Sequence, residues 1–139
     1  MQVSEQVVLP SFEQQFAFGQ MLALQLPAGG VLFLEGEMGA GKTTLTQGIL
    51  DGMGFMGEVN SPTYALMHEY PAPEGLVLHV DAYRIHHAEE LYEMGLDDYV
   101  ERCRLSIIEW GEKLYADFPE GWILKLEYLS EGRQITRLR

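Results

Sequence analysis

The stretch that decides the fold is residues 31–48, which read VLFLEGEMGAGKTTLTQG. It begins with an uninterrupted apolar run, Val31 to Leu34, which predicts a buried parallel strand. Residues 36–43 then match the pattern G-x-x-x-x-G-K-[ST] at every fixed position. Glycine-rich turns between a strand and a helix also occur without ligands, but a full match in this context favours a phosphate-binding loop.

The residue types of this loop suit the phosphates of a nucleotide. Gly36, Gly39 and Gly41 permit sharp turns and a close approach of the backbone, so that successive N–H groups form one concave anion site. The helix that follows adds its positive N-terminal end to the same site. Lys42 is placed to reach the β- and γ-phosphates, and the Thr43 hydroxyl to bind a magnesium ion.

Length and composition limit the class of protein. The chain has 139 residues, of which 47% are hydrophobic, which is enough for one domain with one core and leaves no room for a second. No apolar run approaches the ~20 residues that span a bilayer. The first residues lack the basic and apolar regions of a secretory signal. We therefore expect a single domain over residues 1–139 in a soluble, cytoplasmic protein.

Cysteine content and charge exclude two further classes. Cys103 is the only cysteine, so no intramolecular disulfide can form, and we expect it to be a small buried apolar group rather than a redox centre. Nine Lys and Arg against 21 Asp and Glu give a formal net charge of -12, which opposes sequence-independent binding to nucleic acid. If nucleic acid is involved, we expect another protein to hold it.

The remainder of the chain alternates between strands and helices. We expect helices over residues 12–26 and 42–53, two short helices between 88 and 103, and further strands over residues 6–9, 63–70, 76–81, 105–109, 122–128 and 134–138. This order predicts an α/β fold, a three-layer P-loop NTPase-like sandwich with a mainly parallel central sheet and antiparallel edge strands. Residues 31–35, 76–81 and 105–109 should form the parallel centre, and the terminal hairpin should extend one edge.

Two of these strands end in an acid. Asp81 follows the apolar residues 76–80, and Glu109 follows residues 105–108. Ligands of open α/β folds bind at the carboxyl ends of the strands, which is where both acids should lie. Either acid can bind the magnesium ion, directly or through water, while the other orients an attacking water. The sequence leaves these two assignments open, as it does an ordinary strand end at Glu109.

Three other residues are weaker candidates for the site. Thr63 is displayed after a proline and is our candidate for a sensor of the γ-phosphate and metal, although a β-former that opens a strand explains it equally well. Ser11 should cap the first helix, which we favour over a contact to the nucleotide base. Arg84 can reach a phosphate, but a surface ion pair explains it as well. The histidines complete no metal-ligand spacing: His68, His79, His86 and His87.

With these residues in view, the chain resembles the TsaE (formerly YjeE) family, small bacterial ATPases of tRNA threonylcarbamoyladenosine biosynthesis. The resemblance spans nearly the whole chain. It is carried by GEMGAGKTT at 36–44, SPTY at 61–64, HVDAYR at 79–84 and IEW at 108–110, with Glu90-Leu91, Gly95 and Asp98-Tyr99 between them. The phosphate-binding loop alone is shared by many NTPases, whereas this ordered set is specific to the family.

The resemblance implies that the protein binds and hydrolyses ATP with Mg²⁺ in support of a partner complex, the TsaB–TsaD pair. That complex transfers a threonylcarbamoyl group to an adenosine of tRNAs that read codons starting with A. In this picture the partners bind the tRNA, this chain meets it only indirectly, and no membrane is involved.

The resemblance also implies roles for individual residues. The nucleotide-binding set comprises Gly36, Glu37, Met38, Gly39, Ala40, Gly41, Lys42, Thr43, Thr44 and, at the N-terminal corner, Ser11. Thr43 and Glu109 would bind magnesium, and Asp81 would have a Walker-B-like catalytic or metal-linked role. Thr63 would belong to a switch-like loop, and Trp110 would lie beside the site. The family often has an acidic residue where this chain has Ser11.

Two other functions use the same loop. A small-molecule kinase usually carries a lid with several arginines, whereas Arg84, Arg102 and Arg104 are the only arginines before the C-terminal strands. A nucleotide-gated binding module would use ATP as a switch without turnover. Because no arginine finger other than Arg84 is evident, we expect slow basal hydrolysis that a partner accelerates.

Overall fold

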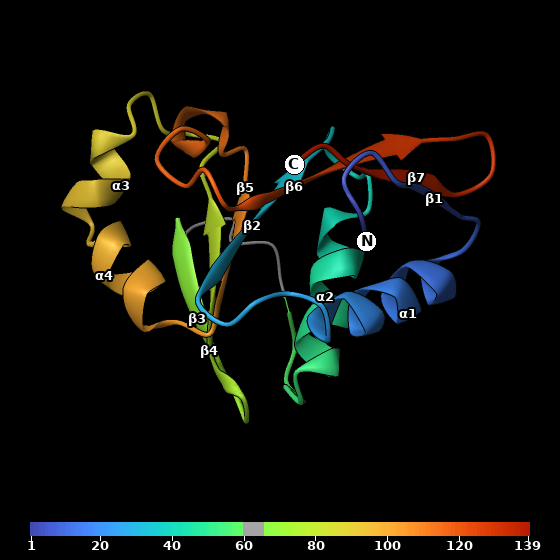
Figure 1. Ribbon diagram of the computed structural model, residues 1–139, viewed down its shortest axis with the longest axis horizontal. Helices are drawn as coiled ribbons and strands as arrows, with labels where there is room; N and C mark the ends of the chain where they lie inside the picture. Colours follow the sequence, from blue (N-terminus) through green and yellow to red (C-terminus); the bar gives the residue numbers. More distant parts are fainter. Residues whose placement is uncertain (60–65) are drawn as a thin grey trace.

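The computed structural model describes residues 1–59 and 66–139 (Figure 1). Within them, a single seven-stranded sheet has the order β1-β7-β6-β2-β5-β4-β3. Its strands are β1 Gln6–Leu9, β2 Gly30–Glu35, β3 Met67–Ala72, β4 Gly75–Asp81, β5 Leu105–Glu109, β6 Trp122–Tyr128 and β7 Arg133–Arg137. The helices are α1 Phe12–Ala23, α2 Lys42–Gly52, α3 Glu89–Glu93 and α4 Leu96–Arg102, with a 3₁₀ turn at Glu112–Leu114.

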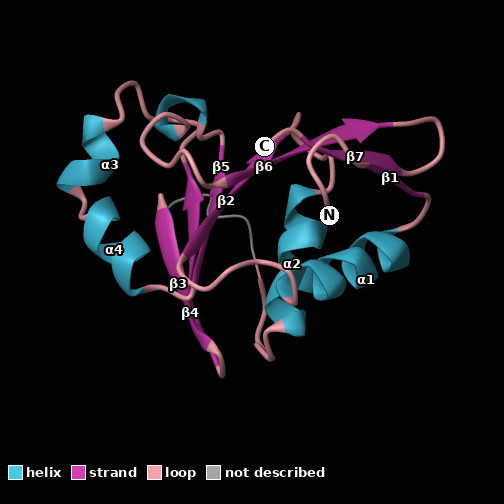
Figure 2. Ribbon diagram, in the orientation of Figure 1, coloured by secondary structure: helices cyan, strands magenta, loops and turns pink. Residues whose placement is uncertain are grey.

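Helices cover both faces of the sheet, which confirms the predicted three-layer α/β fold (Figure 2). The pair α1 and α2 lies on one face, and α3 and α4 lie on the other. Each face has its own apolar core: Leu22 and Ile107 belong to one, Leu91 and Ile108 to the other. Neighbouring residues of β5 thus face opposite layers, as the alternation of side chains along a strand requires.

The centre of the sheet is parallel and its edges are antiparallel. β2 pairs in parallel with β5 and β6, and β5 pairs in parallel with β4. The antiparallel pairs are β3 with β4, β6 with β7, and β7 with β1. The parallel centre was predicted to have three strands, but in the described part of the chain it has four, because β6, the first strand of the terminal hairpin, also pairs in parallel with β2. The sequence of a hairpin does not show which other strand lies beside it.

Several predicted bounds are also wrong. α1 ends at Ala23 instead of residue 26, because the chain turns at residues 24–26; Leu26 is still buried after this turn, whereas Leu24 is 81% exposed. α2 ends at Gly52, one residue early, and Gly54 follows with a φ of 89°, as expected of a helix stop. β3 runs through Pro71 to Ala72, which an edge strand tolerates because an edge strand can lack a backbone donor. The predicted strand start at residue 63 lies outside the described residues.

The structure also bears on Cys103 and on the presence of membrane-spanning helices. Cys103 is buried, as predicted, and burial raises the pKa of its thiol. Among the described residues, no helix has the length and apolar character needed to cross a membrane.

Glycines allow α1 and α2 to pack closely. A Cβ on Gly19 would lie 2.6 Å from the carbonyl oxygen of Leu45, and a Cβ on Gly48 would overlap the carbonyl oxygen of Phe16. The backbones of the two helices therefore touch where they cross. Because Lys42 is the first residue of α2, this contact also fixes the position of the phosphate-binding loop relative to the rest of the fold.

We predict that Gly48→Ala lowers the free energy of unfolding by about 1–3 kcal/mol, because the new methyl group forces the helices apart. Chemical denaturation of the purified variant measures this change. Gln14→Ala, on the exposed side of α1, is the control and should stay within about 0.5 kcal/mol of the native protein. Equal stability of Gly48→Ala and the native protein would contradict the close crossing.

Candidate functional site

The loop between β2 and α2 has the backbone that its glycines were predicted to permit. Gly39 and Gly41 have φ values of 78° and 101°, in the region that favours glycine. A Cβ on Gly36 would lie 2.7 Å from the carbonyl oxygen of Leu126 in β6, and a Cβ on Gly41 2.6 Å from Oε1 of Gln15 in α1. The loop is thus seated against both the sheet and α1: a side chain at position 36 would meet backbone, and one at position 41 would require Gln15 to move.

Side chains of the terminal hairpin hold this loop from the side of the sheet. The Tyr128 hydroxyl donates to the carbonyl of Met38 at 2.7 Å, and Nη2 of Arg133 donates to the carbonyl of Gly39 at 3.2 Å. The Arg133 guanidinium also lies 4.2 Å from the centre of the Tyr128 ring. Sequence reasoning missed both residues, because they lie 90 and 94 residues along the chain from their partners and carry no motif.

Lys42 is buried at the centre of the site. Its Nζ donates to the carbonyl of Gly36 at 2.7 Å and lies 3.9 Å from Oε1 of Glu109. It also lies 4.1 Å from the centre of the Trp110 ring. Burial lowers the pKa of Lys42, and the carboxylates of Glu109 and Asp81 oppose that shift. An additional anion beside this amine would favour its charged form.

The two strand-end acids lie side by side. Asp81 and Glu109 are register partners in the parallel pair of β4 and β5. Glu109 is buried, and its Oε2 lies 2.5 Å from Nε2 of His79. Asp81 is half-buried, and its Oδ1 accepts a hydrogen bond of 2.9 Å from the backbone N–H of Tyr83. Glu109 is therefore fixed inside the site, whereas Asp81 lies nearer to solvent.

A cavity of about 420 Å³ opens in front of the loop. The start of α1, the loop, the start of α2 and the ends of β4 and β5 all contribute to its wall: Phe12, Met38, Gly39, Gly41, Lys42, Thr43, Thr44, Asp81, Glu109 and Trp110. The fold thus gathers most of the residues that the sequence analysis selected. Gly36 and Glu37 line a neighbouring cavity of about 530 Å³, together with Lys125 of β6. Ala40, also a residue of the loop, is buried.

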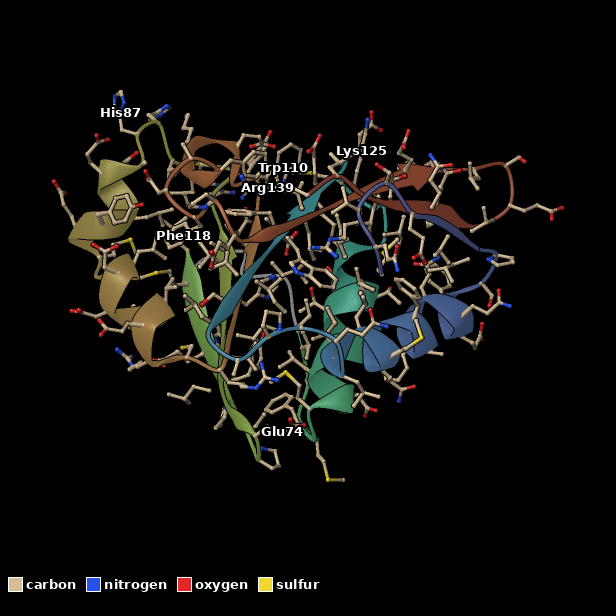
Figure 3. The ribbon with its side chains drawn as sticks, in the orientation of Figure 1. Glu74, His87, Trp110, Phe118, Lys125 and Arg139 are labelled. Atoms are coloured by element: carbon tan, nitrogen blue, oxygen red, sulfur yellow. The ribbon has the colours of Figure 1, made fainter. Side chains whose placement is uncertain are left out.

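Trp110 forms part of the cavity wall in a strained conformation. Its φ is 58°, in the left-handed region that bulky residues rarely adopt. Its ring packs against Tyr83, with 5.0 Å between the ring centroids. Figure 3 shows Trp110 where the chain leaves β5, at the upper edge of the sheet in that view. Strain of this kind costs about 1–3 kcal/mol and clusters at functional sites, which favours a role for Trp110 beyond packing.

Three candidates from the sequence are not gathered at the cavity. Ser11 caps α1, because its Oγ accepts a hydrogen bond of 3.2 Å from the backbone N–H of Gln14, and the next residue, Phe12, lines the cavity instead. Arg84 is exposed and makes no hydrogen bond or ion pair within the described parts of the chain. Thr63 lies outside the described residues, so its predicted sensor role stays a prediction.

The side chains at the cavity suit a magnesium ion that arrives with a nucleotide. Across residues 1–59 and 66–139, no group of three or more His, Cys, Asp or Glu side chains is arranged to hold a metal ion. Magnesium, however, is usually bound by one or two carboxylates together with water and substrate phosphates. Thr43, Asp81 and Glu109 offer one hydroxyl and two carboxylates beside the glycine-rich loop. This partial set fits magnesium bound with a polyphosphate.

Known proteins resemble this chain over most of its length. The family model described as "Threonylcarbamoyl adenosine biosynthesis protein TsaE" matches residues 9–137. The tRNA threonylcarbamoyladenosine biosynthesis protein TsaE of Haemophilus influenzae is 41% identical over 116 residues, which are 83% of this chain and 73% of that protein. The protein of the same name from Bacillus subtilis is 35% identical over 108 residues, 78% of this chain and 67% of that protein.

A solved structure agrees with these sequence matches. The fold is similar to the crystal structure of Bacillus subtilis YdiB, with a TM-score of 0.78 and 26% sequence identity. The similarity covers 99% of this chain and 87% of that one. The chain therefore belongs to the TsaE family of threonylcarbamoyl adenosine biosynthesis proteins.

Proposed function

We propose that residues 1–139 form one P-loop ATPase domain, which binds and hydrolyses Mg-ATP in the cytoplasm to support threonylcarbamoyl transfer to tRNA. Membership of the TsaE family gives the biosynthetic role. The observation that carries the ATPase proposal is the position of Lys42, which lies between a glycine-built loop and two strand-end acids in one cavity. A lysine placed only for stability would not need the adjoining loop or the strained Trp110.

Lys42 and the loop would bind the phosphates. In the structure the Lys42 amine donates to the neutral carbonyl of Gly36. The donor is charged in both contacts, but a phosphate oxygen also carries negative charge, so it attracts the ammonium group more strongly than a neutral carbonyl does. The amine can therefore exchange its carbonyl partner for phosphate at a net gain. Backbone N–H groups of residues 39–44 and the N-terminal end of α2 would hold the remaining phosphate oxygens.

Thr43, Glu109 and Asp81 would hold the magnesium ion, which when bound neutralises charge that develops on the phosphates. Glu109 suits the metal side, because His79 holds its Oε2, its Oε1 lies 3.9 Å from the Lys42 amine, and the side chain is buried. Asp81 suits the orientation of the attacking water, because it is half-buried and shares this edge of the sheet with Glu109. Phosphoryl transfer to water needs this positioning more than covalent chemistry.

The site has too few positively charged side chains for fast ATP hydrolysis. Lys42 is the one basic residue in the cavity wall formed by the described residues. Arg102 pairs with Glu69 at 2.9 Å, and Arg104 donates to the carbonyl of Leu26, so neither serves the site. These positions also argue against the arginine-rich lid of a small-molecule kinase. We propose that a TsaB–TsaD-type partner supplies what is missing and holds the tRNA, since a net charge of -12 disfavours direct binding.

Lys42→Ala should abolish ATP hydrolysis and weaken binding of a fluorescent ATP analogue by about 10-fold or more, because a hydrogen bond to a charged group contributes about 1.5–3 kcal/mol. Lys125→Ala is the matched control. Lys125 lines the neighbouring cavity and should leave both quantities within about twofold of the native values. Hydrolysis that survives Lys42→Ala would mean that the loop has another role.

Addition of a TsaB–TsaD pair should raise the rate of phosphate release above the slow rate of the isolated chain. The same mixture containing Lys42→Ala corrects for hydrolysis by the partners themselves. A high rate of phosphate release by the chain alone would contradict the proposal that the site lacks a positive charge. Nucleotide binding without turnover, even with the partners present, would favour a nucleotide-gated binding module, and a phosphorylated small-molecule product would favour a kinase.

A further inference from the structure

We propose that His79 is a positioning residue of the nucleotide site. It holds one oxygen of the Glu109 carboxylate, so that the other is presented to Lys42 and the cavity. This inference rests on the proposed function of Glu109 in a Mg-ATP site and adds a residue to it. His79 is outside the cavity wall, and its spacing in the sequence gave it no role.

The register of β4 and β5 brings His79 to Glu109. His79 lies opposite Ile107, and two residues further along Asp81 lies opposite Glu109. Residues two apart on a strand share a face, and register partners point to the same side of a sheet. Ile107 belongs to the core on the side that α1 and α2 cover. The side chains of His79, Asp81 and Glu109 therefore lie on that same face. His79 is the diagonal neighbour of Glu109, one step deeper in the sheet.

The contact between the two side chains is buried and specific. Nε2 of His79 lies 2.5 Å from Oε2 of Glu109, and the residues are 0% and 4% exposed. An ionised carboxylate can only accept hydrogen bonds, so Nε2 carries the proton. Nδ1 has no hydrogen-bond partner within the described residues. Within that part of the chain, the polar contact of the buried imidazole is thus directed at Glu109 alone.

A histidine with this single contact is costly unless the contact serves the site. A buried polar atom without a partner lowers stability, and an apolar residue of similar size would avoid that cost at Nδ1. The surroundings would accept such a residue: Val77 and Ile107 are buried nearby, and the Tyr70 ring is 6.5 Å from the imidazole between centroids. The position therefore favours histidine because of Glu109.

The contact divides the two oxygens of the carboxylate between two partners. Oε2 accepts from His79, while Oε1 lies 3.9 Å from the Lys42 amine. The terminal torsion of a glutamate is broad, so a carboxylate without a fixed partner samples many orientations. No other donor to Oε2 is present in the described residues. His79 thereby sets which oxygen is available at the cavity.

This orientation matters for the ion that the site would hold. Magnesium demands near-ideal octahedral geometry, so its affinity depends on how well each carboxylate is aimed. Loss of a partner that orients a metal ligand typically costs 10–100-fold in metal affinity or activity. Loss of His79 should therefore weaken the metal-dependent part of nucleotide binding and leave the metal-free part intact.

Three variants test this role. Leucine removes the donor, glutamine carries an amide nitrogen that can reach the place of Nε2, and asparagine carries one nearer to Nδ1. Mn²⁺ affinity with a non-hydrolysable ATP analogue, measured by electron paramagnetic resonance, should fall about 10-fold or more in His79→Leu and His79→Asn. In His79→Gln it should stay within about threefold of the native value. Affinity for the analogue without metal should change less than about twofold in all three.

A second measurement requires neither a bound metal nor a variant of His79. Long-range ¹⁵N NMR of the native protein should show His79 protonated at Nε2, and Glu109→Gln should shift that nitrogen. Should His79→Leu fail to fold, the comparison of His79→Gln with His79→Asn decides in its place.

The outcomes separate this inference from the function on which it rests. Native Mn²⁺ affinity in His79→Leu and His79→Asn would overturn the positioning role while leaving the ATPase proposal standing. An equal loss in His79→Gln and His79→Leu, or an Nε2 of the native protein that carries no proton, would also overturn it. A native protein that binds neither Mn²⁺ nor the nucleotide would overturn both.

Discussion

A buried ammonium group is the constraint on which the rest of this structure depends. Lys42 begins a helix whose first turn is enclosed by the loop, the sheet and an aromatic ring, and a charge in such a place needs partners. The carbonyl of Gly36, the carboxylate of Glu109 and the face of Trp110 supply them. These groups come from two separate parts of the chain, the loop after β2 and the end of β5, so the loop conformation and the strain at Trp110 are fixed together.

The topology of the sheet delivers those partners to one edge. β2, β4 and β5 run in parallel, so the loop after β2 and the acids that end β4 and β5 meet at the same carboxyl edge. The glycine crossing of α1 and α2 then fixes where α2 begins. On the other side of the loop, Tyr128 and Arg133 of the antiparallel hairpin donate hydrogen bonds to its backbone carbonyls. The parallel centre thus forms the site, while the antiparallel edge supports it.

The parts of the site that sequence predicted are those whose signal is local. The loop is a run of adjacent residues, and Asp81 and Glu109 each end an apolar strand, so spacing alone located them. The position of β6 beside β2, the support from Tyr128 and Arg133, and the contact of His79 with Glu109 depend on pairings across 30 or more residues. Such contacts are set by tertiary packing, and without a motif no single-sequence pattern reports them.

Isothermal calorimetry with Mg-ATP tests nucleotide binding at this cavity most directly, because it needs neither partner proteins nor turnover. Mg-ATP titrated into the folded native protein should give saturable heat at about one nucleotide per chain, the stoichiometry of a single phosphate-binding loop. Titrations with magnesium alone should give none, because the donor set is completed by phosphates. The titration is repeated at several temperatures, so that a binding enthalpy of zero is not mistaken for an absence of binding. If well-folded protein gives no binding heat at any of them, the proposal that this cavity binds Mg-ATP is wrong.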